Sequence, residues 1–357
     1  MAWRSPGFNS PWVQKNMQNF LKRLLGTGFL ILVGGIFLAE VTVLSIVLMP
    51  REPQDSAALF SDREILLENT DNFLKSVNLI FVGDIMLSRF VGDKIKTENN
   101  WSWPFLKIAD YLKQADLTVG NLESPISNRG IKVGSIYSFR ADPGVVAGLN
   151  LAGFDILSVA NNHIGDYTRT AMEDTLNILK ANNINYIGGG FNENEAHSAV
   201  VKEIKGLKIA FLAYTALGAK YTEAQSENSG IAWLNQERMV GDVKAAKENS
   251  DFVVVFVHFG EEYQKKANAF QKNIAHIAID SGASLVIGHH PHVVQEIEQY
   301  KNGYIAYSLG NFVFDQLFSE DTMTGLILKV ILNNKKEIEI EQIKTKITKD
   351  FQVELTE

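Results

Sequence analysis

The stretch Asn78-Leu-Ile-Phe-Val-Gly-Asp84 decides the fold, because it joins an apolar run directly to a carboxylate. The run is short, apolar on both faces and contains β-branched residues, which is the pattern of a buried central strand. In an open α/β sheet, ligands bind just outside the carboxyl ends of such strands. The heptapeptide therefore predicts an α/β protein with a functional site at one edge of a sheet.

Apolar runs of the same kind recur along the chain, at residues 117–119, 155–160, 208–213, 252–257, 284–287 and 304–307. Every run except 208–213 is followed by polar side chains of types that bind metals. In chain order these side chains are Asp84, Asn121, Glu123, Asn161, Asn162, His163, His258, His289, His290, His292, Asn311 and Asp315. Because the carboxyl ends of parallel strands meet at one edge of a sheet, we expect these side chains to converge.

Helical patterns lie between the strands, at residues 168–182, 236–249 and 268–281. This alternation favours layers of sheet and helix. Two antiparallel hairpins are also expected, over residues 200–214 and 325–346. We therefore expect mixed β-sheets flanked by helices, in one folded domain over residues 77–357.

The types of side chain limit the metal. The chain of 357 residues has no cysteine, so a metal site must use imidazole, carboxylate and amide ligands, a set that suits Mn²⁺, Fe or Zn²⁺. In His290-Pro291-His292 the proline stiffens a loop that presents two imidazoles, and two ions about 3.5–4 Å apart act together on a displacement at phosphorus. Taken singly, Asp84 also fits a helix N-cap and His258 a half-buried histidine. The joint pattern favours a metal centre.

The overall charge narrows the choice of partners. A net charge of −7 argues against nucleic acid, and an anionic polymer or phosphoester substrate would have to be met by local basic groups. Four basic residues lie in predicted loops near the strand ends: Arg89, Arg129, Lys132 and Arg140. They suit a polyanion at the mouth of the site, although loop cations of this kind are also found simply solvated.

The N-terminal part of the chain predicts a membrane anchor. Residues 24–49 are almost wholly apolar and long enough to cross a hydrocarbon core of about 30 Å. Lys22 and Arg23 precede this span, so the positive-inside rule puts residues 1–23 in the cytoplasm. Residues 50–76 are predicted to be a stalk. We therefore expect a single-pass protein of the cell membrane with an extracellular C-terminal domain.

Two alternatives remain within this segment. A cleaved signal peptide would have an apolar region of about 7–15 residues, which is shorter than the one present. Glu40 lies inside the span, where a charge is costly, and it either reaches toward the outer interface or contacts a helix of a partner protein.

Six successive motifs resemble those of the CapA/PgsA family of poly-γ-glutamate capsule biosynthesis proteins, within the calcineurin-like metallophosphoesterase superfamily. They are Gly83-Asp84-Ile-Met-Leu-Ser-Arg89, Asn121-Leu-Glu123-Ser-Pro125, Ala160-Asn-Asn-His-Ile-Gly-Asp-Tyr167, His258-Phe-Gly-Glu-Glu-Tyr263, Gly288-His-His-Pro-His-Val-Val-Gln295 and Tyr307-Ser-Leu-Gly-Asn-Phe-Val-Phe-Asp315. The resemblance implies a metallophosphoesterase sandwich of two mixed sheets flanked by helices. It also implies a role in poly-γ-glutamate synthesis or export, with membrane-bound synthase subunits as partners.

The same resemblance implies a ligand set. Asp84 would serve one metal together with His292, and Glu123 stands where phosphoesterases place a bridging aspartate. The second metal would take three further ligands: Asn162, His258 and His290. A substrate-binding set follows from the neighbouring motif positions: Asn121, Arg89, Arg140 and Asn311. His163 matches the histidine that protonates a leaving group, and Asp166 would orient it.

Two departures from the pattern predict unequal metal sites. Phosphoesterases usually carry Asp-x-His in the first motif, whereas here the third position is Met86, a thioether that binds such ions weakly. The bridging residue is Glu123, one methylene longer than aspartate. One tight and one weak divalent site are therefore expected, which casts doubt on simple phosphatase activity.

Three functions fit these expectations. The first is a metal-dependent hydrolase or transferase that acts on a phosphoester or on the γ-glutamyl polymer. The second is a non-catalytic subunit that holds the polymer within a membrane synthesis complex. The third is a cell-envelope phosphoesterase unrelated to capsule.

The expected topology can be checked on intact cells. Protease added outside should digest the domain that follows residue 50, because the Lys22 and Arg23 side of the span stays in the cytoplasm. Immunoblotting of the chain before and after lysis measures this. Cleavage confined to residues 1–23 would show that the orientation is reversed.

Overall fold

The structure is a computed structural model that describes residues 76–356. Within them, one sheet has eight strands: β1 (Val77–Ile85), β2 (Leu117–Leu122), β3 (Ile156–Ser158), β4 (Asn185–Ile187), β13 (Asn311–Val313), β14 (Thr324–Leu332), β15 (Ile338–Ile347) and β16 (Val353–Leu355). Their order is β16-β15-β14-β1-β2-β3-β4, with β13 also paired to β1. Strands β1 to β4 run parallel to one another, whereas the pairs β1–β14, β14–β15 and β15–β16 are antiparallel.

The second sheet has six strands: β6 (Val200–Ile204), β7 (Leu207–Thr215), β9 (Phe252–His258), β10 (Leu285–His289), β11 (Ile297–Tyr300) and β12 (Gly303–Ala306). Their order is β11-β12-β10-β9-β7-β6. The pairs β7–β9, β9–β10 and β10–β12 are parallel, and the two outer pairs are antiparallel hairpins. A small third sheet joins β5 (Gly189–Gly190) to β8 (Gly230–Ile231).

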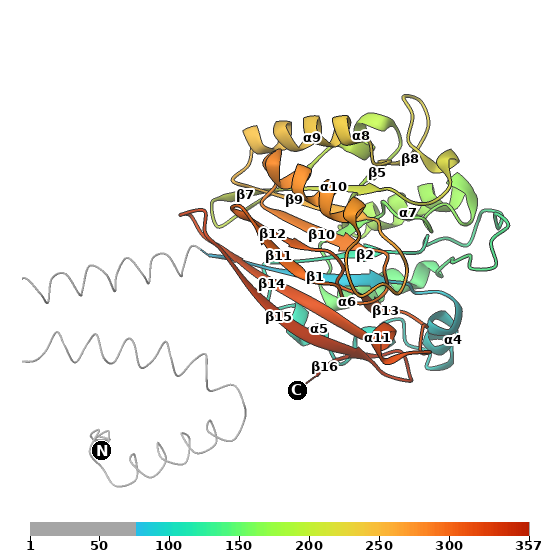
Figure 1. Ribbon diagram of the computed structural model, residues 1–357. Coiled ribbons are helices and arrows are strands. Elements are labelled where there is room, and N and C mark those ends of the chain that lie inside the picture. Colours follow the sequence, from blue (N-terminus) through green and yellow to red (C-terminus); the bar gives the residue numbers. More distant parts are fainter. Residues whose placement is uncertain (1–75, 357) are drawn as a thin grey trace, which may run out of the picture. The chain divides into compact units, whose positions relative to one another are not determined.

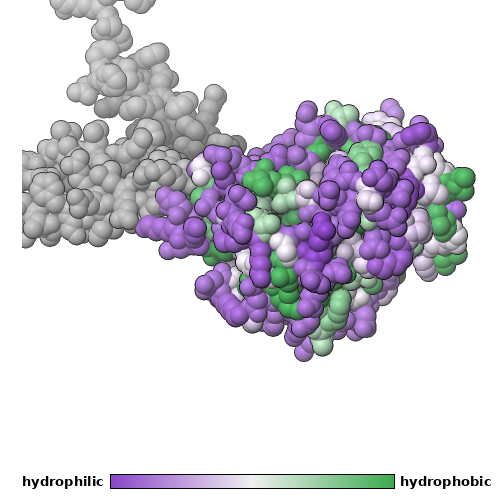
Figure 2. All heavy atoms as spheres, turned by 90° about the horizontal axis from the view of Figure 1, so that it is seen from above, coloured by the Kyte–Doolittle hydropathy of each residue, from purple (hydrophilic) through white to green (hydrophobic). Residues whose placement is uncertain are grey.

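Helices cover the outer face of each large sheet (Figure 1). The described α-helices are α4 (Arg89–Thr97), α5 (Ala109–Leu112), α6 (Val146–Ala152), α7 (Thr168–Ala181), α8 (Glu193–His197), α9 (Gln236–Glu248), α10 (Ala269–Asp280) and α11 (Glu320–Met323). Apolar residues of α4 to α7 pack on the first sheet, and those of α9 and α10 pack on the second. Viewed over α9, the surface is largely hydrophilic with scattered hydrophobic patches (Figure 2), as expected for helices with one buried face.

A third apolar layer lies between the two sheets. It combines the inward side chains of β1, β2 and β14 with those of β7, β9 and β10. The rings of Phe81 and Phe256, one from each sheet, lie 5.9 Å apart in this layer. Because both faces of each sheet are covered, the central strands are apolar throughout, which is the pattern seen in the sequence.

The structure confirms the expected mixed sheets, the flanking helices and both hairpins. Helix α10 begins where its sequence predicts, because Asn268 and Gln271 form a capping box. Among the described residues, no helix is long and apolar enough to span a membrane. The predicted anchor at residues 24–49 lies outside the described residues, as do the segment 1–23 and the stalk apart from its last residue.

The close approach of β1 and β13 brings two motif loops together. A Cβ atom at Gly83 would lie 1.9 Å from the carbonyl oxygen of Gly310. The next residue, Asp84, donates its backbone N–H to that same oxygen over 3.0 Å. Only glycine fits at position 83, because any side chain would meet the backbone of Gly310.

Gly83→Ala should therefore destabilise the fold by about 3 kcal/mol or more, because the added methyl group meets rigid backbone. Gly241→Ala is the control, since Gly241 is exposed in α9 and nothing lies within 4 Å of an added Cβ. That change should stabilise by about 0.5–1 kcal/mol. Urea unfolding of both variants measures the difference, and a neutral Gly83→Ala would contradict the tight β1–β13 contact.

Candidate metal centre

The predicted ligands meet where the parallel strands of both sheets end. Asp84 lies near the end of β1, in register with Asn121 of β2, and Glu123 follows β2 directly. His258 ends β9, and its register partner His289 ends β10. The carboxyl ends of four strands from two sheets therefore face a common centre.

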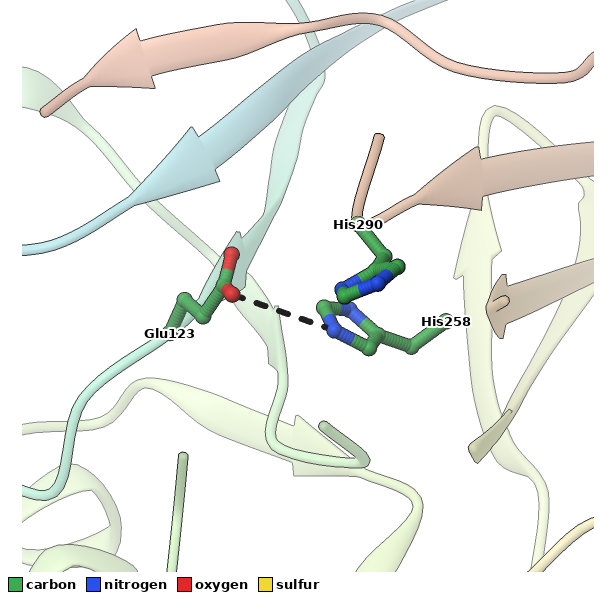
Figure 3. Close-up of side chains that lie close together, drawn as sticks. All are labelled: Glu123, His258 and His290. Atoms are coloured by element: carbon green, nitrogen blue, oxygen red, sulfur yellow. Dashed lines mark ion pairs between the residues drawn. The ribbon is translucent and has the colours of Figure 1, made fainter. Parts of the chain in front are cut away.

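Glu123 is the core of this centre. Its side chain is fully buried, and neither carboxylate oxygen has a hydrogen-bond partner. The Oε1 atom lies 3.8 Å from Nε2 of His258 and 3.8 Å from Nε2 of His292. Nε2 of His163 lies 4.0 Å from the same oxygen. Figure 3 shows the carboxylate facing the imidazoles of His258 and His290.

These distances indicate a gap for a metal ion. They are too long for hydrogen bonds, which span about 2.7–3.2 Å. Two ligands that each bind one ion at about 2.0–2.2 Å lie roughly 3–4 Å apart, which is the separation seen around Glu123. A buried carboxylate without partners is costly unless a cation compensates it. The residues present therefore fit divalent metal.

The ligand atoms fall into two groups that share Glu123. One group is Asp84, Glu123 and His292, and the other is Glu123, His258 and His290; within each, the ligand atoms lie within 4.8 Å of one another. Asn162 lies beside the second group, where its Oδ1 accepts a hydrogen bond from Nε2 of His258 over 2.7 Å, and its role as a ligand stays a prediction. The arrangement brings together the two ligand sets that the family resemblance implies. Which ions they hold stays a prediction.

Buried amides and imidazoles hold the ligands in place. Asp84 Oδ1 accepts hydrogen bonds from Asn121 Nδ2 (2.9 Å) and His289 Nδ1 (3.0 Å). His292 Nδ1 donates to Asn311 Oδ1 over 2.9 Å, which leaves Nε2 directed at the centre. Asn121 and Asn311 are fully buried and bonded to ligands, and their predicted contact with substrate stays a prediction. His289, which the predicted ligand set does not include, contributes to the site through its bond to Asp84.

The turn that carries His163 is fixed by its own sequence. Asn161 Oδ1 accepts from the backbone N–H groups of His163 (3.1 Å) and Ile164 (3.0 Å), as asparagine commonly does in turns. His163 Nδ1 donates to Asp166 Oδ2 over 2.8 Å, and the imidazole stacks on Phe139 at 4.0 Å between ring centroids. The other nitrogen, Nε2, consequently points toward Glu123. Asp166 thus orients His163 in the way that the family resemblance implies.

A cavity of about 350 Å³ opens beside this histidine. Its lining includes His163, Asp166, Asn162, Tyr221 and His290. The cavity therefore touches both the oriented imidazole and the second ligand group, so a bound molecule would reach both.

The pKa shifts of the ligands bear on how they bind a cation. Burial raises the pKa of Glu123 well above its ordinary value, and the charge of Asp84 adds to this. Burial also raises the pKa of Asp84, but hydrogen bonds with His289 and His292 outweigh it and hold that pKa well below its ordinary value. Burial lowers the pKa of His258 well below its ordinary value and that of His290 to about 4. Both imidazoles are therefore neutral at pH 7, the form that binds metals.

Two predicted substrate-binding arginines already have partners. Arg89 Nε lies 3.0 Å from Asp315 Oδ2, and its guanidinium is 5.3 Å from the Phe139 ring. Arg140 Nη1 donates to the backbone oxygen of Arg129 over 3.0 Å. Their roles in substrate binding stay predictions, and Arg89 contacts Phe139, whose ring also packs against His163.

The fold and the site together define a two-sheet α/β protein with a candidate metal centre at its parallel strand ends. The family model described as "Bacterial capsule synthesis protein PGA_cap" matches residues 78–316. The chain belongs to this family.

Several known proteins are similar. "Capsule biosynthesis protein CapA" of Bacillus anthracis is 33% identical, over 71% of this chain and 63% of that protein. "PGA biosynthesis protein CapA" of Bacillus subtilis (strain 168) is 32% identical, over 69% and 66%. The match thus spans just under two thirds of these relatives. The NAD nucleotidase NadN of Haemophilus influenzae has a TM-score of 0.46 at 10% identity, over 79% of this chain and 60% of that structure.

Metal binding should release the proton of Glu123. The raised pKa of Glu123 keeps its carboxyl protonated at mildly acidic pH, and a cation displaces that proton. Asp84 is already ionised, and His258 and His290 are already neutral, so they release none. Affinity should therefore rise with pH until Glu123 has ionised.

Calorimetric titration of the full-length protein with Mn²⁺ measures this release, in buffers that differ in ionisation enthalpy. His276→Ala is the control, because His276 contacts Glu298 outside the centre and the proton release should stay unchanged. Binding without proton release in the unmodified protein would contradict the charge state assigned to Glu123.

Proposed function

We propose that the chain acts in poly-γ-glutamate capsule synthesis or export, through a metal-dependent hydrolase-type site of the metallophosphoesterase kind. The capsule role is supported by the printed names of the two Bacillus relatives and by the family description. The substrate class is a phosphoester or the γ-glutamyl polymer itself. The observation that carries the proposed chemistry is the buried Glu123 carboxylate, which lacks partners and faces three imidazoles.

The proposed cofactors are divalent ions, Mn²⁺, Fe or Zn²⁺, held in one tight and one weak site. Four residues support the tight site: Glu123, Asn162, His258 and His290. The other site has Asp84, Glu123 and His292. The Met86 sulfur accepts hydrogen bonds from the Ser88 backbone N–H (3.2 Å) and hydroxyl (3.1 Å), so its acceptor capacity is already used. When bound, the ions would polarise a phosphoryl or carbonyl oxygen and an attacking water.

The chain's own residues would supply orientation and a proton. His163 would donate a proton from Nε2 to the leaving group, and Asp166 would keep Nδ1 protonated and stabilise the charged ring. The backbone N–H of Phe139 also donates to Asp166 Oδ2, over 2.7 Å, which fixes the carboxylate in turn. The cavity beside His163 would receive the substrate.

The proposed setting is the outer face of the cell membrane. This part rests on the apolar span at residues 24–49 and on Lys22 and Arg23 before it. Membrane-bound poly-γ-glutamate synthase subunits are the proposed partners, in keeping with the names of the relatives.

A second candidate is a non-catalytic subunit that holds the polymer. The observation in its favour is Met86, because a metal site without its imidazole acts poorly as half of a two-metal centre. Metal-dependent hydrolysis by the purified chain separates the two candidates.

His163→Ala should abolish that hydrolysis while the unfolding free energy changes by no more than about 1 kcal/mol, as for a loop residue outside the core. A synthetic phosphodiester and poly-γ-glutamate are the test substrates, and metal content is measured in parallel. His276→Ala is the matched control, because His276 contacts Glu298 (3.0 Å) and Tyr300 outside the centre. A His163→Ala protein with full activity would rule out the proton-donor role.

A further inference from the structure

We infer that Glu262 is an additional metal ligand, which completes the Asp84 site from its exposed side. The inference rests on the proposed metal centre and adds a residue to it.

Glu262 forms a third ligand group with the two histidines of the 290–292 loop. One carboxylate oxygen of Glu262 and one ring nitrogen each from His290 and His292 lie within 4.8 Å of one another. The same two histidines belong to the two groups that share Glu123. Glu262 is exposed and Glu123 is fully buried, so the histidines lie between an outer and an inner carboxylate.

The histidines of this loop are built for ligation. His290 is more than nine-tenths buried, and its Nδ1 has no hydrogen-bond partner. Both residues have positive φ angles, 99° at His290 and 58° at His292, which are strained for residues with a side chain. Such strain persists where surrounding contacts enforce it, and it is concentrated at functional sites.

The loop that carries Glu262 is fastened to the same region. Tyr263 donates its backbone N–H to the carbonyl of Pro291 over 2.8 Å, directly between the two histidines. On one side, Phe259 donates its backbone N–H to His289 (3.1 Å); on the other, Gln295 Nε2 donates to the carbonyl of Gln264 (2.7 Å). These bonds hold the 259–264 segment against the 289–295 segment, so Glu262 stays beside the histidines although its side chain is exposed.

The ligand count explains what Glu262 adds. The Asp84 site has three protein ligands, whereas the proposed ligand set of the other site has four once Asn162 is included. The difference arises because position 86 supplies a thioether that is bonded to Ser88. Glu262 shares its group with both His290 and His292, and we assign it to the Asp84 site through His292 because that site lacks an imidazole at position 86. This assignment raises the count at the Asp84 site to four. An exposed carboxylate is hydrated and loses rotamer freedom on binding, so it contributes less than a buried imidazole. The two sites therefore stay unequal, with the Glu262 site the more easily emptied.

The test is calorimetric titration of the full-length protein with Mn²⁺, for the unmodified chain, Glu262→Gln and Glu261→Gln. Glu262→Gln should weaken the weaker site by about 10- to 100-fold and leave the tight site unchanged. Glu261→Gln removes the same charge one residue away and should change neither site by as much as threefold, a limit of about 0.6 kcal/mol. Equal melting temperatures in chelator verify that both variants fold.

The outcomes separate this inference from the proposed metal centre. If the unmodified protein binds no Mn²⁺, the metal centre itself is wrong. If it binds two ions and Glu262→Gln binds them equally well, only the role of Glu262 is wrong. If both variants weaken binding equally, Glu262 acts only through its charge and not as a ligand. If Glu262→Gln loses the tightly bound ion, Glu262 belongs to the other site. Either result overturns the inference.

Discussion

The candidate site depends on one buried carboxylate, that of Glu123. Glu123 follows a central strand into a region without solvent, where its two oxygens find no donor. Removing a carboxylate from water without a partner costs several kcal/mol, and the raised pKa of Glu123 reflects that cost. Three imidazoles at 3.8–4.0 Å leave a space of the size that divalent ions fill. The space beside the Glu123 carboxylate therefore fits a divalent cation.

The two sheets make this arrangement possible because each contributes parallel strands that end at the same edge. Close backbone contact between β1 and β13 sets the position of Asp84, and the β9–β10 register places His258 beside His289. Buried amides then link the strands: Asn161 Nδ2 donates to Asn121 Oδ1, and Asn121 Nδ2 donates to Asp84. Ligands from distant parts of the chain thus share one rigid network, which reduces the ordering needed when a cation binds.

Most of the fold and the ligand cluster could be predicted from the sequence, because buried parallel strands are apolar on both faces and their ends converge. The edge strands are harder to predict, because β4 and β16 are only three residues long and show no clear hydrophobic pattern. The roles of Asn121 and Asn311 follow from register with Asp84, which a sequence does not reveal. Arg89 pairs with Asp315, and Arg140 donates to a backbone carbonyl. Such contacts depend on loop conformation, which the sequence does not show. Glu262 lies within the motif His258–Tyr263, but its nearness to His292 depends on a backbone hydrogen bond between Tyr263 and Pro291.

The most direct test of the account is the metal content of the full-length protein, measured by elemental analysis after purification and dialysis against metal-free buffer. The account predicts about one tightly held divalent ion per chain in the unmodified protein and none in Glu123→Gln, because Glu123 belongs to both ligand groups. A Glu123→Gln protein that keeps its ion would contradict the central role of this carboxylate.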